Sequence, residues 1–224
     1  MITAAKSLAL ENKATINWER FRVDVLDYLD NTAPGMWRKT FVPLVRGVVT
    51  DQVSKWAGIL GLQFDVQPLF ARDWYNKYIQ GMPIPIIDTT KNAVGVIIDQ
   101  ALAEGWSISS MQDAIMQAFD IMEPYRSERI ARTETIRASN AGTTDQFREW
   151  GVQRHEWLST QDDRTRRKPP DDFDHVEANG EVVNIGDPFM ATGEPLMYPG
   201  DPAGDPGNTI NCRCTTIPVM EGMT

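Results

Sequence analysis

Residues 199–214, PGDPAGDPGNTINCRC, close a segment whose composition differs from that of the rest of the chain. Residues 171–207 contain no Lys or Arg, and their nine acidic residues are Asp171, Asp172, Asp174, Glu177, Glu181, Asp187, Glu194, Asp201 and Asp205. The 224-residue chain has 31 acidic and 22 basic residues, so these nine account for its whole net charge of −9. Residues 169–207 also hold seven of the 14 prolines and six of the 16 glycines, which is typical of turns. The sequence therefore predicts a specialised, loop-rich C-terminal module.

The overall composition is ordinary for a soluble globular protein, with 42% hydrophobic and 24% charged residues. No apolar run approaches the roughly 20 residues of a membrane span, and the apolar stretch in residues 1–10 is too short for a secretory signal. We therefore expect a protein that is made and kept in a cytoplasm and makes no membrane contact. The negative net charge argues against strong direct nucleic-acid binding, which depends on neutralisation of phosphates by Lys and Arg.

Residues 12–150 carry apolar residues at helical spacing. We expect helices through Trp18–Leu29, after Pro34 to Trp56, through Phe70–Ile79, from the caps Thr89 and Thr90 to Gly105, from the cap Ser107 through Phe119, and from Pro124 to about Trp150. The last helix has a face of small residues, namely Ala131, Thr135, Ala138 and Gly142. Small side chains let a neighbouring backbone approach closely, so we expect this helix to be central to the packing.

The helical pattern ends at Gly151, and brief strands are predicted after it at 155–160, 182–183 and 214–217. The predicted fold class is α+β, with a mainly helical N-terminal region and a small loop-rich C-terminal module that contains short β-strands. We divide the chain into a helical docking region (1–80), a helical region that ends in the long central helix (81–150) and the acidic module (151–224).

Two charged clusters have simple structural interpretations. On the long helix, Arg129, Arg132 and Arg137 alternate with Glu128 and Glu134, a pattern typical of a solvated face with ion pairs. In the second cluster, Asp162 and Asp163 precede four basic residues, Arg164, Arg166, Arg167 and Lys168. This basic run could bind phosphate, but pairing with the acidic stretch that follows it is the simpler interpretation.

His175, Cys212 and Cys214 are the candidate metal ligands. Thiolates and imidazoles bind zinc, but a closed structural site needs four ligands, and Cys-x-Cys is tighter than the usual Cys-x2–4-Cys spacing. A module without a cofactor, in which the thiols are buried and the histidine holds a turn, is therefore the favoured interpretation, and zinc is the alternative. Motifs of hydrolases, P-loop enzymes, zinc proteases and Rossmann enzymes are missing from the sequence, so we expect no enzymatic activity.

Several segments occur in an order that resembles a known family. They are Ile130-Ala131-Arg132-Thr133-Glu134, Asn140-Ala141-Gly142, Trp157-Leu158-Ser159-Thr160 followed by Asp162-Asp163-Arg164-Thr165-Arg166, His175, Asn179-Gly180, Phe189, Pro199-Gly200-Asp201-Pro202 and Asn211-Cys212-Arg213-Cys214. Over about residues 85 to 216 this set resembles the phage head-morphogenesis, or minor head protein, family typified by protein F of phage Mu.

The resemblance implies a low-copy structural protein of a tailed-phage virion or procapsid, at the portal vertex or inner capsid, present in the host cytoplasm during assembly. It would act in head assembly, DNA retention or DNA delivery. The portal protein is the expected partner, with the major capsid or scaffold protein and a second copy of the chain as further candidates.

The same resemblance implies signature positions, which are Arg132, Glu134, Trp157, Asp163, Arg164, His175, Asn211, Cys212, Arg213 and Cys214. We interpret them as a polar network that holds the C-terminal loop against the long helix, with Arg132 and Glu134 as a buried pair. Some relatives carry a Cys-x-x-Cys where this chain has Arg166-Arg167-Lys168-Pro169, which weakens the zinc alternative. Two other readings remain open: a toxin-like effector enzyme, a transferase or hydrolase, that uses His175, Asp162, Asp163 and Glu134, and a zinc-stabilised interaction module.

Overall fold

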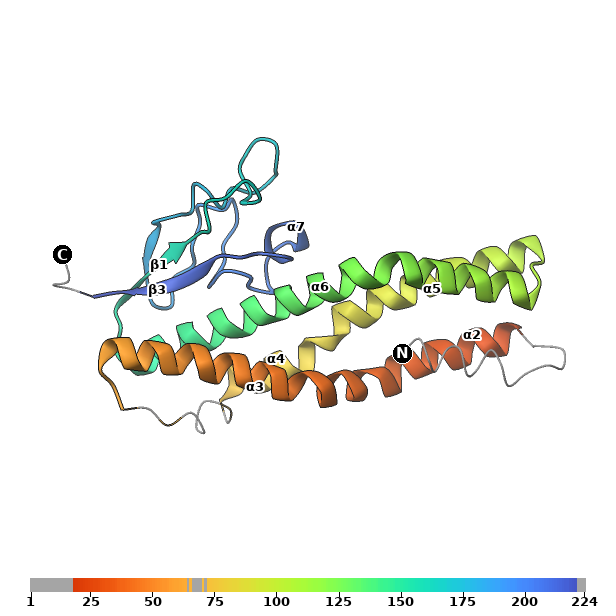
Figure 1. Ribbon diagram of the computed structural model, residues 1–224, viewed down its shortest axis with the longest axis horizontal. Helices are drawn as coiled ribbons and strands as arrows, with labels where there is room; N and C mark the ends of the chain where they lie inside the picture. The colour runs from red at the N-terminus through yellow and green to blue at the C-terminus, as the bar shows by residue number, and fades with distance from the viewer. Residues whose placement is uncertain (1–17, 64, 66–69, 71, 221–224) are drawn as a thin grey trace. The chain divides into compact units, whose positions relative to one another are not determined.

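The computed structural model describes residues 18–63, 65, 70 and 72–220 (Figure 1). The chain forms two compact units. The first consists of the chain up to Val42 together with Ile79–Glu128, and the second consists of Pro43–Tyr78 and Arg129–Thr224. Helices dominate the described residues, and a small antiparallel sheet lies in the C-terminal region, so the predicted α+β class is confirmed.

The order of the elements follows the predicted change from helices to a loop-rich segment. They are α2 (Trp18–Asp27), the π-helix η1 (Tyr28–Thr32), α3 (Ala33–Leu60), α4 (Asp73–Gly81), α5 (Pro83–Glu104), α6 (Ile108–Glu149), β1 (Arg154–Leu158), β2 (Val182–Asn184), α7 (Pro206–Thr209) and β3 (Thr215–Val219). Among the described helices, none combines the length and the apolar character needed to cross a membrane.

The core of the first unit is formed by apolar side chains from α2, η1, α3, α5 and α6. Its buried members are Val25, Leu29, Ala33, Ile87, Val94, Ile98, Ala101 and Met111. Val25, Leu29 and Ala33 recur every four positions through α2, η1 and the start of α3, and Val94, Ile98 and Ala101 of α5 recur every three or four positions. This is the predicted amphipathic pattern. The Arg126 side chain of α6 adds a polar link to α5, since its Nη2 donates to the Ile86 carbonyl (2.8 Å) and the Thr90 hydroxyl (2.6 Å).

The predicted start of α5 at Thr89 and Thr90 is wrong. The helix begins at Pro83, and the two hydroxyls donate to the carbonyls of Pro85 and Ile86, four residues back, at 2.8 and 3.0 Å. Proline suits the first turn of a helix because the backbone donor that it lacks has no partner there in any case. The predicted end is confirmed, because Gly105 adopts the left-handed conformation (φ 66°) that terminates many helices.

The long helix is longer than predicted, because α6 is one continuous helix of 42 residues that passes through position 124. The predicted cap is confirmed, since the Ser107 hydroxyl accepts a hydrogen bond from the Ser110 amide at 3.1 Å. The sequence predicted a helix boundary there because a proline inside a helix costs about 3 kcal/mol, whereas the backbone is helical on both sides of this position.

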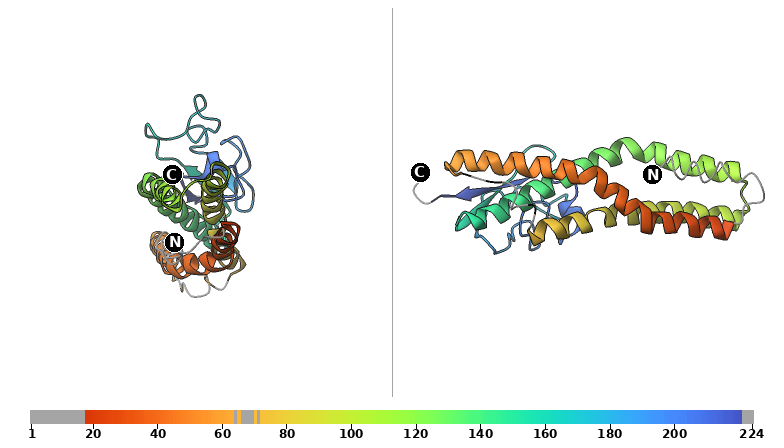
Figure 2. Two further views of the ribbon diagram at one scale, coloured as in Figure 1. Left: turned by 90° about the vertical axis from the view of Figure 1, so that its right-hand side faces the viewer. Right: turned by 90° about the horizontal axis from the view of Figure 1, so that it is seen from below.

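The C-terminal part of α6 is the central element of the second unit. Its buried side chains between positions 138 and 147 are Ala138, Asn140, Ala141, Thr143, Thr144, Gln146 and Phe147. At Gly142, α3 lies so close that an added Cβ atom would be 2.8 Å from Val49 Cγ1. Figure 2 draws the orange part of α3 beside the teal end of α6. The predicted small-residue face is confirmed at Ala138 and Gly142, whereas Ala131 and Thr135 are exposed.

Three short strands form an antiparallel sheet in the order β2-β1-β3, and each contains residues predicted to be extended. In β1, His155 and Trp157 are buried while both end residues are exposed. His155 pairs with Val183 of β2, and Trp157 pairs with Thr216 of β3. The core beside this sheet consists of Trp157, Ala178, Phe189, Leu196, Cys212 and Cys214.

Replacing Gly142 should test the packing of α6 against α3. In Gly142→Ala the new methyl group would overlap Val49, and overpacking of this kind costs about 1–3 kcal/mol of unfolding free energy. Gly47→Ala, also in a helix, is the matched control, because no atom lies within 4 Å of its Cβ position. Alanine there should stabilise by about 0.5–1 kcal/mol. Urea unfolding followed by circular dichroism measures both, and equal stabilities of Gly142→Ala and wild type would contradict the close approach.

Candidate functional site

The fully buried side chain of Asn140 joins α6 to the C-terminal module. Its Nδ2 donates to the carbonyls of Pro199 (2.9 Å) and Cys214 (3.0 Å). Its Oδ1 accepts from the Thr215 hydroxyl (2.9 Å) and the Thr216 amide (3.3 Å). A carboxamide has two donors and two acceptor lone pairs, so this side chain is fully used. It therefore fixes both the loop before α7 and the start of β3 (Figure 1).

One turn earlier on α6, Arg137 makes a second set of contacts with the module. Its guanidinium donates to the Glu134 carboxylate (3.0 Å), the Gly200 carbonyl (3.1 Å) and the Thr209 hydroxyl (3.3 Å). The Tyr78 hydroxyl of α4 donates to the other oxygen of Glu134 at 2.6 Å. Burial raises the pKa of Glu134 above its ordinary value, although the Arg137 charge and the Tyr78 hydroxyl both oppose this rise.

The predicted buried pair of Arg132 and Glu134 is therefore wrong. Residues two positions apart on a helix do not face each other, whereas residues three apart do, so Glu134 pairs with Arg137. Arg132 instead donates to the Asn211 side chain at 2.7 Å, and the neighbouring Thr133 hydroxyl accepts from the Asn211 backbone amide at 2.9 Å. Both Arg132 and Asn211 thus join α6 to the loop, as the signature interpretation requires.

Asp162 forms a bidentate ion pair with Arg213, the residue between the two cysteines. The Arg213 guanidinium is the main reason that the pKa of Asp162 lies well below its usual range, with a further contribution from the Arg164 amide. Asp163 and the side chain of Arg164 are exposed. Asp162, which is not among the signature positions, therefore contacts the Cys-x-Cys segment, whereas the signature residue Asp163 is exposed.

The basic run after Asp162 joins the acidic stretch through backbone amides. The amide of Arg167 donates to the Asp171 carboxylate (3.1 Å), and that of Lys168 donates to Asp174 (3.0 Å). The Arg166 guanidinium reaches further and donates to the Ile210 carbonyl at 2.6 Å. Burial alone would raise the pKa of Asp174, but the amides of nearby residues bring it below its ordinary value. The predicted intramolecular association is correct, although these two contacts use the acidic side chains and only the backbone of the basic residues.

Carboxylates accept backbone amides throughout the acidic stretch. Glu181 accepts from Met190 and Ala191, Asp201 from Met197 and Ala203, Glu194 from Asp205, Asp205 from Gly207, and Asp174 from Glu177 as well as Lys168, at 2.6–3.0 Å. Backbone donors that are not paired in helices or sheets need other acceptors when the chain is compact. These acids therefore supply hydrogen bonds that regular secondary structure supplies elsewhere.

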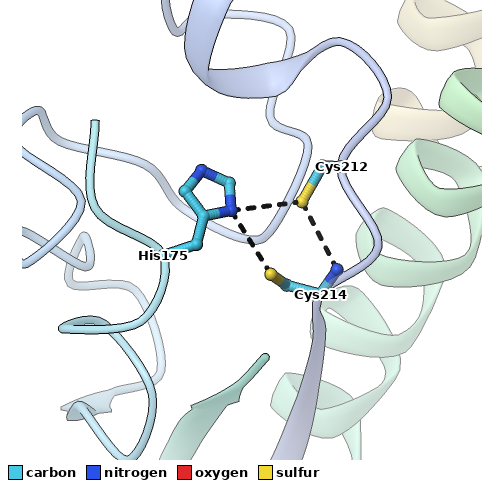
Figure 3. A group of neighbouring side chains, drawn as sticks. All are labelled: His175, Cys212 and Cys214. Carbon is cyan, nitrogen blue, oxygen red and sulfur yellow. Dashed lines mark hydrogen bonds between the residues drawn. The ribbon is translucent and has the colours of Figure 1, made fainter. Parts of the chain in front are cut away.

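His175, Cys212 and Cys214 lie together in the core of the module, each at most 2% exposed (Figure 3). The Nδ1 atom of His175 is 3.3 Å from the Cys214 sulfur and 3.8 Å from the Cys212 sulfur. On its other side, Nε2 is 2.6 Å from Asn208 Oδ1. The Cys214 amide donates to the Cys212 sulfur at 3.4 Å. The three predicted ligand residues therefore do converge, although no bond links them to a fourth His or Cys in the described chain.

The two thiols differ in their acidity. The Cys214 thiol, helped by His175, lowers the pKa of Cys212 well below its ordinary value against the effect of burial. The same contact, together with burial, raises the pKa of Cys214.

His155 is the other buried histidine, and it lies in β1 on the face toward Phe189, at 4.6 Å between ring centroids. Its Nδ1 is hydrogen-bonded to the Thr216 hydroxyl at 2.9 Å. Burial, with a smaller effect from Arg148, lowers the pKa of His155 to about 4. The imidazole is therefore neutral in the folded protein at physiological pH.

A family model described as "Phage Mu protein F like protein" matches residues 92–217, from α5 to β3. This match covers more than half of the chain and every residue of the network described above except Tyr78. The chain belongs to the phage Mu protein F-like family. Comparison with curated proteins and with solved structures gave no match. The family points to a structural protein related to phage heads.

Within this phage Mu F-like region, three residues outside the signature positions carry much of the network. Asn140, Arg137 and Asn208 each make at least two of its hydrogen bonds. The sequence predicts a solvated face for Arg137, and it points to Asn140 only as part of a segment that resembles the family. A signal existed for Asn140, which stands beside small residues on a helix face expected to be buried. No sequence signal distinguishes Asn208 from the other polar residues of a turn-rich segment.

Removal of the Asn140 side chain should test its role as the main link. Asn140→Ala would leave two carbonyls, one amide and one hydroxyl without their partner, and we expect a loss of about 2–4 kcal/mol in unfolding free energy. Asn92→Ala, at an exposed position of α5, is the control and should change stability by less than about 0.5 kcal/mol. Urea titrations measure the unfolding free energy of both variants. Equally small losses in the two variants would contradict the role of Asn140 as the main link.

The low pKa of His155 predicts a specific pH dependence of stability. Between pH about 6.5 and 4 the unfolded chain binds a proton that the folded protein does not, so the unfolding free energy falls as the pH falls. The expected loss is about 3 kcal/mol at pH 4. In His155→Asn, which keeps an acceptor near Thr216, this part of the dependence should vanish. Urea titrations from pH 7 to pH 4 measure the unfolding free energy of both proteins. If it falls by the same amount in wild type and in His155→Asn, the prediction is contradicted.

Proposed function

We propose that the protein is a minor head protein of a tailed phage, located at the portal vertex or on the inner capsid wall. It acts in head assembly, DNA retention or DNA delivery through contacts with other head proteins. The family match over residues 92–217 is the observation that carries this proposal. The proposal places the protein in the virion, and in the host cytoplasm during assembly.

The contacts of the signature residues support a structural role without catalysis. Glu134 is held by Arg137 and Tyr78, and Asp162 is held by Arg213. His175 contacts Asn208 and the two thiols. An effector enzyme that used these groups as acid and base would need them in one site, whereas each has separate partners. We therefore propose that these side chains stabilise the module and perform no reaction.

The surfaces of the described helices support docking through protein contacts. Several large apolar side chains on them are well exposed, among them Val96 (66%) and Tyr125 (75%). The module contributes an excess of acidic residues, and juxtaposed like charges disfavour contact with packaged DNA. We propose that the helical part docks to the portal protein, with the major capsid or scaffold protein and a second copy as further partners, and that duplex DNA is not bound tightly.

Co-expression with the portal protein of the same phage, followed by size-exclusion chromatography with light scattering, tests this function. We expect co-elution with the portal assembly, and the scattering mass gives the stoichiometry. The double variant Val96→Glu and Tyr125→Glu should weaken co-elution because it places charge on the helical surface. Met190→Glu is the matched control, since Met190 is also exposed (54%) but lies in the module. Elution of the wild-type protein apart from the portal would contradict portal docking.

A further inference from the structure

Three soft donor atoms meet at one buried point of the module. The ligand atoms of His175, Cys212 and Cys214 all lie within 4.8 Å of one another, and the Nδ1–sulfur distances are 3.3 and 3.8 Å (Figure 3). In a tetrahedral zinc site, bonds of about 2.1 Å to nitrogen and 2.3 Å to sulfur place these atoms about 3.6 Å apart. The two Nδ1–sulfur distances are therefore already close to those between ligands that share one ion.

The hydrogen bonds of Asn208 fix the proton on His175. The Asn208 Nδ2 donates to the Glu194 carboxylate at 2.8 Å and to the Thr192 hydroxyl at 3.2 Å. Because a carboxylate only accepts, the amide nitrogen must face Glu194 and Oδ1 must face His175. Oδ1 accepts in turn, so Nε2 of His175 carries a proton. Nδ1 faces the two sulfurs and is the nitrogen that is available to a metal, which is the arrangement that a metal ligand needs.

The surroundings of the sulfur atoms also favour metal binding. The Cys214 amide donates to the Cys212 sulfur at 3.4 Å, and a hydrogen bond of this kind favours a thiolate. The single lone pair on Nδ1 can accept a proton from one thiol but not from both. A cation bonded to Nδ1 and to both sulfurs would instead use every donor atom in the cluster.

We propose that His175, Cys212 and Cys214 bind a zinc ion, with a water molecule as the fourth ligand. Thiolate and imidazole together suit zinc better than magnesium or calcium, which take oxygen ligands. Binding would join the loop around His175 to the segment that enters β3, 37 and 39 residues later, and its free energy would add to that of folding. This inference depends only on the geometry of the module and stands apart from any role at the portal.

Metal analysis of the full chain, purified without chelator and then dialysed against zinc, tests the proposal. We expect about one zinc per chain, and cobalt in its place should show the thiolate charge-transfer and tetrahedral ligand-field absorption bands. Asn208→Leu removes the acceptor for Nε2–H and should weaken zinc binding about 10–100-fold. His155→Asn is the matched control, because it alters a buried histidine of the same module outside the cluster and should leave zinc binding unchanged.

A wild-type measurement keeps the test decisive if a variant fails to fold. Modification of both thiols with a mercurial should release the zinc to a chromophoric chelator, and excess zinc should raise the melting temperature. Folded protein that binds less than about a tenth of an equivalent after dialysis, with a melting temperature insensitive to zinc, would overturn the proposal. Equal zinc affinities of Asn208→Leu and wild type would also overturn the assigned ligand geometry.

Discussion

The second unit depends on one requirement, which is that every buried backbone amide of a loop-rich segment must find an acceptor. Between β1 and β3 the described chain contains only a three-residue strand and a four-residue helix. Most of its amides therefore cannot pair in ladders. Backbone carbonyls in turns accept many of these amides. Carboxylates accept others, among them the amides of Met190, Ala191, Met197 and Ala203. The acidic residues therefore contribute to the fold of the module through these hydrogen bonds.

The same requirement accounts for the acidic residues of positions 171–207, where the sequence contains no Lys or Arg. The partial positive charges of amide groups serve as their counterparts, as in the loops closed by Glu181 and Asp201. Arginines appear where the module meets another segment: Arg137 reaches it from α6, and Arg213 reaches back to Asp162. Charge pairs therefore hold segments together, while carboxylates shape the turns within them.

The sequence predicted the classes of structure well and the individual contacts less well. Helical periodicity identified the helices α2 to α6, and alternation identified β1, because burial of an apolar face leaves a regular pattern. The short helix α7 lies in a segment that the sequence predicted to be turns. Boundaries at Thr89 and Pro124 were wrong, since helix propensity at one residue yields to the packing of many. The pairing of Glu134 with Arg137 follows from helical geometry alone and could have been predicted. The contacts of Asn140 and Asn208 with distant residues could not, because no periodic pattern encodes how an irregular loop folds back.

Native-state hydrogen exchange of the module's amides tests most directly whether carboxylates replace regular secondary structure. The amides of Met190, Ala191, Met197 and Ala203 all donate to a side-chain carboxylate. We expect them to exchange as slowly as the amides of Phe189 and Leu196, which are paired with each other's carbonyls. Exchange of these four amides at the rate of an unstructured loop, while Phe189 and Leu196 stay protected, would contradict the role assigned to the acidic residues.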